Sequence, residues 1–139
     1  MDYEFLDFTS DVLFRAYGRD EKELLVNAAK AMFSVICEIG SVRPVRTVEI
    51  ACSGASLEEL LYEWLSTLLT ESEIEEMFFS EFHIDVIEER DNMLSLRGRA
   101  LGEDATVEKG ATLVKGVTYY QLKVEKRDGG YAATVSLDI

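Results

Sequence analysis

Hydrophobic and polar positions along the chain divide it into extended and helical segments. Near the N-terminus, residues 3 to 8 and 11 to 17 alternate with a period of two, which predicts two short strands or one interrupted strand. In the second segment, the apolar side chains that begin at Val12 share one face. Asp11 stands just before them and is a poor strand former. This aspartate is therefore either a turn residue or a ligand that the strand holds in place.

Two segments have the spacing of amphipathic helices. Asp20 and Ser56 are each followed three residues later by a glutamate, which is the arrangement of a capping box. Behind each cap, apolar residues recur at intervals of three and four, so we expect a helix from each cap, the first ending at Gly40. Trp64 lies on the apolar stripe of the second helix, which predicts a core position for it.

The rest of the chain reads as strands. They are expected at residues 45–52, 82–89, 93–101, 112–126 and 131–138. The inward positions predicted for the hairpin that turns at Asp91 and Asn92 are Phe82, Ile84, Val86, Leu94 and Leu96. The predicted fold class is α+β: a single domain over residues 1–139, with a mostly antiparallel β-sheet and two amphipathic helices packed on one face.

The charge balance limits the class of partner. The chain carries 27 acidic and 14 basic residues, a formal net charge of −13, which disfavours direct binding to a nucleic-acid backbone. Such a surface suits cations or a basic protein. No apolar run is long enough for a membrane span, and the N-terminus lacks the basic region of a signal peptide, so we expect a cytoplasmic protein without membrane contact. Cys37 and Cys52 are expected to be reduced thiols.

Most catalytic groupings are absent from the sequence, and carboxylates remain as the candidate chemistry. There is no GxSxG elbow, P-loop or GxGxxG, and the single histidine, His83, falls on the polar face of a strand. Asp138 lies beside the terminal carboxylate of Ile139, and Asp11 joins them if the sheet brings it to the same end. Oxygen-only ligands suit Ca²⁺ or Mg²⁺, whereas the alternative is a flexible acidic tail.

Five blocks of the sequence, in order, resemble the archease family. They are FTSDVLFRAYG, LLVNAAKAMF, LLYEWLSTLL, VKGVTYY and TVSLDI, and together they span nearly the whole chain. The resemblance implies a non-enzymatic protein cofactor of the GTP-dependent RNA ligase of tRNA splicing, which promotes ligase guanylylation and multiple turnover. It also implies a metal site at Asp11, Asp138 and Ile139, for which calcium is the expected ion and magnesium the alternative.

Residues of the VKGVTYY block are candidates for contact with the ligase. These are Lys115, Thr118 and Tyr119. Lys115 has two other interpretations, an ion pair with the acidic cluster or an ordinary exposed strand lysine.

The chain differs from the family pattern at four positions. The family histidines are replaced by Phe8 and Tyr120, an alanine by Gly116, and an acidic residue ahead of the second helix by Ser56. Two other functions remain open: a small metal-dependent hydrolase or nucleotide-processing enzyme that uses the same carboxylates, and a metal-stabilised binding module for another partner.

Overall fold

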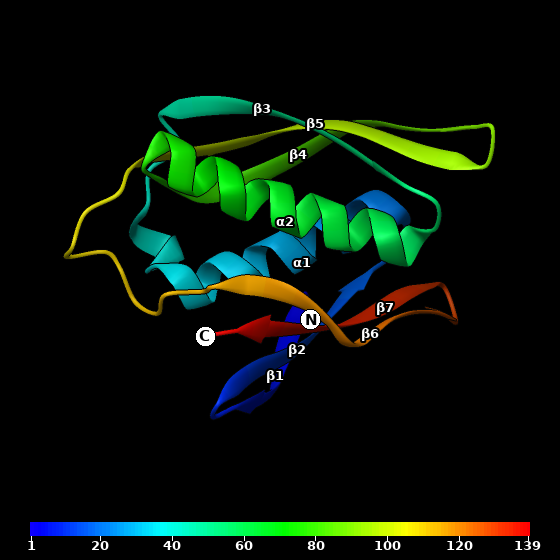
Figure 1. Ribbon diagram of the computed structural model, residues 1–139, viewed down its shortest axis with the longest axis horizontal. Coiled ribbons are helices and arrows are strands. Elements are labelled where there is room, and N and C mark those ends of the chain that lie inside the picture. Colours follow the sequence, from blue (N-terminus) through cyan, green and yellow to red (C-terminus); the bar gives the residue numbers. More distant parts are fainter.

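Seven strands form two antiparallel sheets, and two helices lie between them (Figure 1). The computed structural model describes residues 1–139. One sheet has the strand order β1-β2-β7-β6 and the other β3-β5-β4. The strands are β1 (Tyr3–Phe8), β2 (Asp11–Gly18), β3 (Arg46–Gly54), β4 (Met77–Arg90), β5 (Met93–Asp104), β6 (Gly116–Arg127) and β7 (Gly130–Asp138). The helices are α1 (Glu21–Ile36) and α2 (Leu57–Glu75), and a short 3₁₀ turn, η1, covers Ile39–Ser41.

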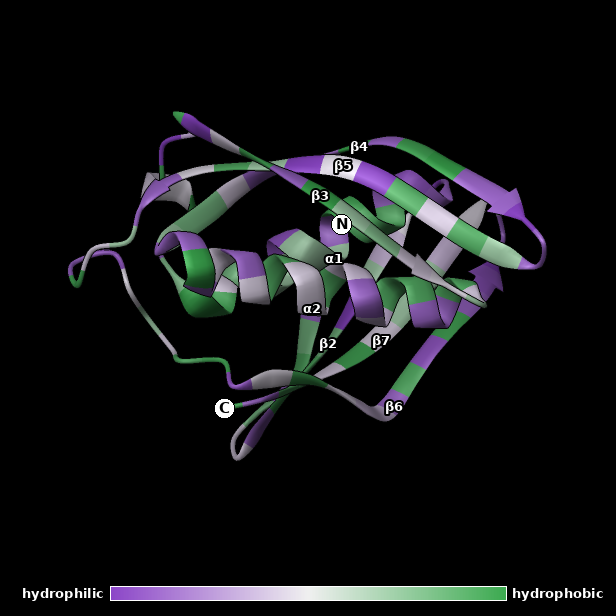
Figure 2. Ribbon diagram, turned by 45° about the horizontal axis from the view of Figure 1, so that its top comes forward, coloured by the Kyte–Doolittle hydropathy of each residue, from purple (hydrophilic) through white to green (hydrophobic).

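The α+β class, the antiparallel pairing and the two amphipathic helices are confirmed, but the strands are divided between two sheets. Helix α1 packs on β2 and β4, and helix α2 packs on β3 and β6, so each helix contacts both sheets. The side chains of α1 explain this layering, since nine of its residues are buried and, at 3.6 residues per turn, they span most of the circumference of the helix. One sheet cannot cover so wide an apolar surface, and the second sheet closes it. Figure 2 shows the two helices between the strands of the two sheets.

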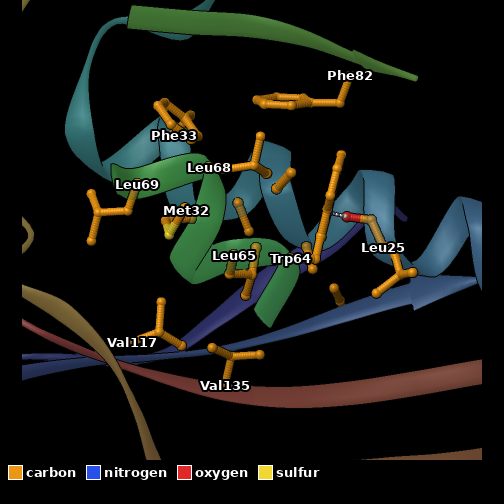
Figure 3. Close-up of a cluster of buried hydrophobic side chains, with 14 of the residues drawn as sticks. Leu25, Met32, Phe33, Trp64, Leu65, Leu68, Leu69, Phe82, Val117 and Val135 are labelled. Carbon is orange, nitrogen blue, oxygen red and sulfur yellow. Dashed lines mark hydrogen bonds between the residues drawn. The ribbon is translucent and has the colours of Figure 1, made fainter. Parts of the chain in front are cut away.

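The core lies in the helical layer and is filled from all three layers. Trp64 of α2 is fully buried, as predicted, and its indole Nε1 donates a hydrogen bond to the Leu25 carbonyl of α1 at 2.9 Å. Phe82 reaches this cluster from one sheet and Val117 and Val135 reach it from the other (Figure 3). The two helices therefore share one hydrophobic core with both sheets.

Both helix caps form as the sequence predicts, but α1 ends early. Asp20 accepts a hydrogen bond from the Glu23 amide at 2.8 Å, and Ser56 accepts one from the Glu59 amide at 3.1 Å. The predicted end at Gly40 is wrong, because the backbone is extended at Cys37, which forms an isolated bridge with Gly110.

Two irregularities in β4 change the predicted inward positions of this strand. The pairing of β4 with β5 shifts between Phe79 and Glu81 and again between Ile84 and Val86. Each shift moves the alternation by one residue. Phe82 is buried and Ile84 packs against the core as predicted, but the assignment of Val86 is wrong, because Ile87 takes the place next to the core.

The opposite strand, β5, has the predicted inward residues. Leu96 is buried, and Leu94 is partly buried against the core. The turn at Asp91 and Asn92 forms as expected, since both residues have positive φ angles, of 52° and 64°.

Residues 105–115, here called the crossing segment, connect one sheet to the other. The sequence predicts a strand from residue 112, but β6 begins only at Gly116. The crossing segment is instead fixed to the end of α1, since the Ala111 amide donates to the Ile36 carbonyl at 2.9 Å and the Thr112 amide to the Val35 carbonyl at 3.0 Å. Because these two amides bond to α1, they do not pair with a neighbouring strand.

A carboxylate fixes the base of the crossing segment. Glu103 has a side chain that is only 11% exposed, and it accepts hydrogen bonds from the Lys109 ammonium and from the Arg43 amide, both at 2.7 Å. The hydrogen bond from Lys109, followed by that from the Arg43 backbone, lowers the pKa of Glu103 to about 2. The carboxylate is therefore ionised in the folded protein over nearly the whole pH range.

This low pKa predicts a specific loss of stability in acid. A carboxyl group whose pKa is lowered by folding stabilises the protein at pH values above its pKa in the unfolded chain, which is near 4.5. This stabilisation disappears as the pH falls toward 2. We expect Glu103→Gln to lower the melting temperature at neutral pH, with the difference from wild type shrinking between pH 4.5 and 2. Calorimetry across this range measures it, and a constant difference would contradict the assignment.

Candidate carboxylate site

The register of two neighbouring strands brings Asp11 and Asp138 together. Strands β2 and β7 are antiparallel, and Asp11 lies directly opposite Asp138. The next pair inward, Val12 and Leu137, is fully buried under the helices. Because side chains alternate along a strand and directly opposed residues share a face, both aspartates lie on the outer face of the sheet. Both are exposed at the strand ends.

The two carboxylates have no partner of opposite charge. Neither the Asp11 nor the Asp138 side chain makes a hydrogen bond or an ion pair, although the Asp138 carbonyl accepts a bond from the Lys115 amide at 2.7 Å. On its other side Asp138 faces Gly116, where a side chain would meet no atom within 4 Å. Two like charges directly opposite each other on a sheet repel, so this pair favours a bound cation.

Ile139, the third residue of the predicted site, directly follows Asp138. Strand β7 continues through Asp138, and the Ile139 side chain is partly buried against the core. Packing of this side chain holds the terminal residue on the fold, which disfavours the alternative of a flexible acidic tail. Its carboxylate follows Asp138 directly in the chain.

The available donors suit a hard divalent cation. No cluster of three or more His, Cys, Asp or Glu side chains that could hold a metal is present, so a metal at this site would need the terminal carboxylate as its third protein ligand. The Asp11 and Asp138 side chains and this carboxylate supply only oxygen, which Ca²⁺ and Mg²⁺ prefer. The residues present therefore fit such an ion.

The other polar groups of predicted interest lie away from this arrangement. The His83 ring is partly exposed and contacts Glu81 at 2.9 Å. Both cysteines are free, and burial raises the pKa of the Cys37 thiol to about 12 and that of Cys52 to about 11. Neither thiol is suited to nucleophilic chemistry at neutral pH.

The predicted ligase-contacting residues lie on the edge strand β6, which pairs with β7 next to Asp138, or directly before it. Lys115 is exposed and makes no ion pair, so an ion pair with the acidic cluster is not seen. Thr118 lies opposite Ser136, and after it the register of β6 against β7 jumps as far as Lys123. The residues in between leave the ladder, including Gln121 at a positive φ of 57°.

This bulge presents two consecutive tyrosines. Tyr119 is 61% exposed, and its ring stacks on that of Tyr62 of α2 with centroids 4.0 Å apart. Tyr120, where the resemblance implies a histidine, is 66% exposed. Two successive bulky aromatics inside an otherwise alternating segment were the only signal of this bulge in the sequence.

The second position where the resemblance implies a histidine is Phe8, near the end of β1. Phe8 lies opposite Val12 at the end of the β1–β2 hairpin, one pair away from Asp11. Its ring is 48% exposed and contacts Phe5 with centroids 5.9 Å apart. Because directly opposed residues share a face, Phe8 lies on the inner face with the buried Val12, whereas Asp11 lies on the outer face.

Neither helix crosses a membrane, because neither is both long and apolar enough.

The chain resembles known proteins over almost its entire length. Residues 3–139 match the model of the Archease protein family (MTH1598/TM1083). This chain is 40% identical to protein archease of Methanosarcina barkeri, over 99% of this chain and 95% of that protein. It is 37% identical to protein archease of Sulfurisphaera tokodaii, over 99% of this chain and 98% of that protein.

Solved structures show the same fold. The solution structure of Methanobacterium thermoautotrophicum protein 1598 superposes with a TM-score of 0.85 and 33% identity, covering 99% of both chains. The crystal structure of a Thermotoga maritima archease, described as a possible chaperone, superposes with a TM-score of 0.61 and 18% identity, covering 96% of this chain and 94% of that one. The family match and the relatives together show that this chain belongs to the archease family.

Proposed function

We propose that this protein is a non-enzymatic activator of the GTP-dependent RNA ligase of tRNA splicing, which promotes guanylylation of the ligase and its multiple turnover. In this proposal a divalent cation, Ca²⁺ by preference and Mg²⁺ as the alternative, is held by Asp11, Asp138 and the Ile139 carboxylate. Family membership supports the activity. The observation that carries the site is the direct opposition of two unpaired aspartates beside the chain end.

The surface around the carboxylates supports docking to a basic protein. The chain has a net charge of −13, whereas the RNA-binding surface of a protein is positively charged. Lys115, Thr118 and the exposed Tyr119 lie on β6 or directly before it, the strand that pairs with β7 next to Asp138. A ligase that contacts this edge would meet the bound cation as well, and complementary charge would speed the encounter.

The test is a ligase turnover assay with purified ligase, GTP, and RNA in excess over ligase. Wild-type protein is expected to raise both ligase guanylylation and the number of turnovers, whereas Asp138→Ala is expected to reduce the stimulation at least tenfold. An extension of two residues after Ile139 moves the carboxylate while keeping every side chain, so it is expected to act like Asp138→Ala. Full stimulation by both variants would remove the carboxylates from the mechanism.

The same preparation tests the function that the sequence leaves as an alternative. Incubation of the protein alone with GTP and Mg²⁺ is expected to yield no product. Steady product formation that Asp11→Ala abolishes would replace the activator with a metal-dependent hydrolase.

A further inference from the structure

A second surface feature, separate from the carboxylates, is a groove of about 830 Å³ between the C-terminal end of α2 and the crossing segment. Nine of its fourteen lining residues are hydrophobic. Its lining includes Leu69 at the end of α2, the deeply buried Val114, and the partly buried Ile36 and Phe78. The crossing segment is at the left of Figure 1, at the same end of the molecule as the C-terminus.

The outer wall of this groove exposes large aliphatic side chains to solvent. Val107 is 94% exposed and Leu113 is 76% exposed, and both belong to the crossing segment. Single exposed aliphatics are ordinary, but two that line the same apolar groove are typical of an interaction site.

The helix side of the groove is acidic and electrostatically unfavourable. Glu73 and Glu76 line the groove, and neither forms an ion pair. They lie at the C-terminal end of α2, which carries no basic residue in its last turn. The partial negative charge of a helix C-terminus repels carboxylates, so these two side chains lack the partner that the local field favours.

The conformation of Glu76 adds a second cost at the same rim. Its φ and ψ angles are 53° and 50°, the left-handed conformation in which a helix-capping glycine is usual. A side chain in this conformation is strained relative to glycine. The chain therefore places a carboxylate at the groove where the backbone alone would favour glycine.

Main-chain hydrogen bonds hold both walls of the groove. Main-chain hydrogen bonds at Ala111 and Thr112 fix the crossing segment to α1, and the Ala105 amide donates to the Glu76 carbonyl at 2.9 Å. Both walls are therefore held in place before binding, which lowers the entropic cost of association. The crossing segment also leads toward the carboxylate site, because the amide of Lys115, the residue after Val114 of the lining, donates to the Asp138 carbonyl at 2.7 Å.

We infer that this groove binds a basic amphipathic segment of a partner protein. Apolar side chains of that segment enter between Val107, Leu113 and the floor, and its lysine or arginine side chains meet Glu73 and Glu76. The inference rests on the proposed function in one respect, since the partner is taken to be the ligase whose active site the adjacent carboxylates serve. Occupation of the groove would fix the orientation of the carboxylate site on that partner.

The experiment measures binding of the full-length ligase by titration calorimetry, and its activation as a function of activator concentration. Val107→Ser and Leu113→Ser change side chains that are almost wholly exposed, so both variants should fold normally. Each is expected to raise the dissociation constant about tenfold. Each variant is also expected to raise, by the same factor, the activator concentration that gives half-maximal stimulation of the ligase. The maximal stimulation should stay unchanged, because the carboxylates are intact. Met93→Ser, at the distant β4–β5 hairpin, is the matched control and is expected to bind like wild type.

A second variant separates binding from stability. Glu76→Gly relieves the positive φ and is expected to raise the melting temperature by about 3 °C. It is also expected to weaken ligase binding about threefold and to reduce the salt dependence of binding. A purely structural role for Glu76 cannot lower affinity while stability rises. Unchanged binding by Val107→Ser, Leu113→Ser and Glu76→Gly would overturn the inference.

A labelled peptide makes the result independent of the ligase. A helical peptide with leucine on one face and lysine on the other is expected to bind the wild-type protein. Its affinity for Leu113→Ser is expected to be about tenfold lower. A peptide of the same pattern with glutamate in place of lysine should not bind. Equal binding of both peptides, or a dimer of this chain that Leu113→Ser dissolves, would contradict the basic occupant. Failure of wild type to bind or stimulate the ligase would instead refute the proposed function and leave the peptide result to decide the groove.

Discussion

Calcium at about one hundred times its dissociation constant is expected to raise the melting temperature of this protein by roughly 9 °C. A ligand that binds only the folded state at this excess stabilises it by about 2.7 kcal/mol. An unfolding entropy of about 2.1 cal/mol/K per residue over 139 residues converts that energy into the shift. The physical cause is the removal of repulsion between Asp11 and Asp138, which face each other without any cation from the protein. Differential scanning calorimetry with and without Ca²⁺ measures the shift, and Mg²⁺ in its place tests the alternative ion.

Removal of one ligand charge should reduce this shift to about half or less. A tenfold loss of affinity, about 1.4 kcal/mol, would lower it to about 5 °C at the same calcium concentration. We expect at least this loss for Asp11→Asn and for Asp138→Asn, and also for an extension after Ile139 that displaces only the terminal carboxylate. Asp128→Asn, an exposed acid in the β6–β7 turn, makes the same change in net charge and should keep the full shift. Equal shifts in all four variants would show that calcium binds elsewhere.

The pairing of the two aspartates could be anticipated only in part from the sequence. Alternation places Asp138 on a strand and suggests that Asp11 begins another, but no local pattern specifies that these strands are neighbours in register. The family resemblance supplied the pairing, and the structure shows it as direct opposition. The open space beside Asp138 at Gly116 depends on a third strand, whose start the sequence placed four residues too early.

Sequence periodicity failed where tertiary contacts replace local ones. Residues 112–115 have strand-like composition, yet their backbone bonds go partly to the end of α1, because the chain must cross from one sheet to the other there. The bulge after Thr118 and the shift at Ile84 likewise insert residues that no period of two can indicate. Both the groove and the exposed Tyr119 arise from these irregular segments, so the sequence alone did not reveal either surface.

The single tryptophan, by contrast, was correctly assigned to the core, and its removal is expected to have a large effect on stability. Trp64 is fully buried between α2 and α1, and its indole donates to the Leu25 carbonyl (Figure 3). Trp64→Ala leaves a cavity where the two helices meet both sheets, which costs about 3–5 kcal/mol. This is a large share of the ~5–15 kcal/mol that stabilises a typical domain, and it corresponds to a melting temperature lower by about 10–17 °C. Urea unfolding followed by circular dichroism measures it, since the variant lacks the tryptophan fluorescence.

Two variants distinguish the parts of this effect. Trp64→Phe keeps a ring but loses the indole N–H, so its cost should fall between wild type and alanine, with the hydrogen bond to Leu25 contributing about 1 kcal/mol of it. Ile74→Ala on the same helix removes an apolar side chain that is 66% exposed, and we expect a change within about 0.5 kcal/mol. If Ile74→Ala were as costly as Trp64→Ala, burial between the two sheets would not be the source of the tryptophan's contribution, and the helical layer would not be the core of the fold.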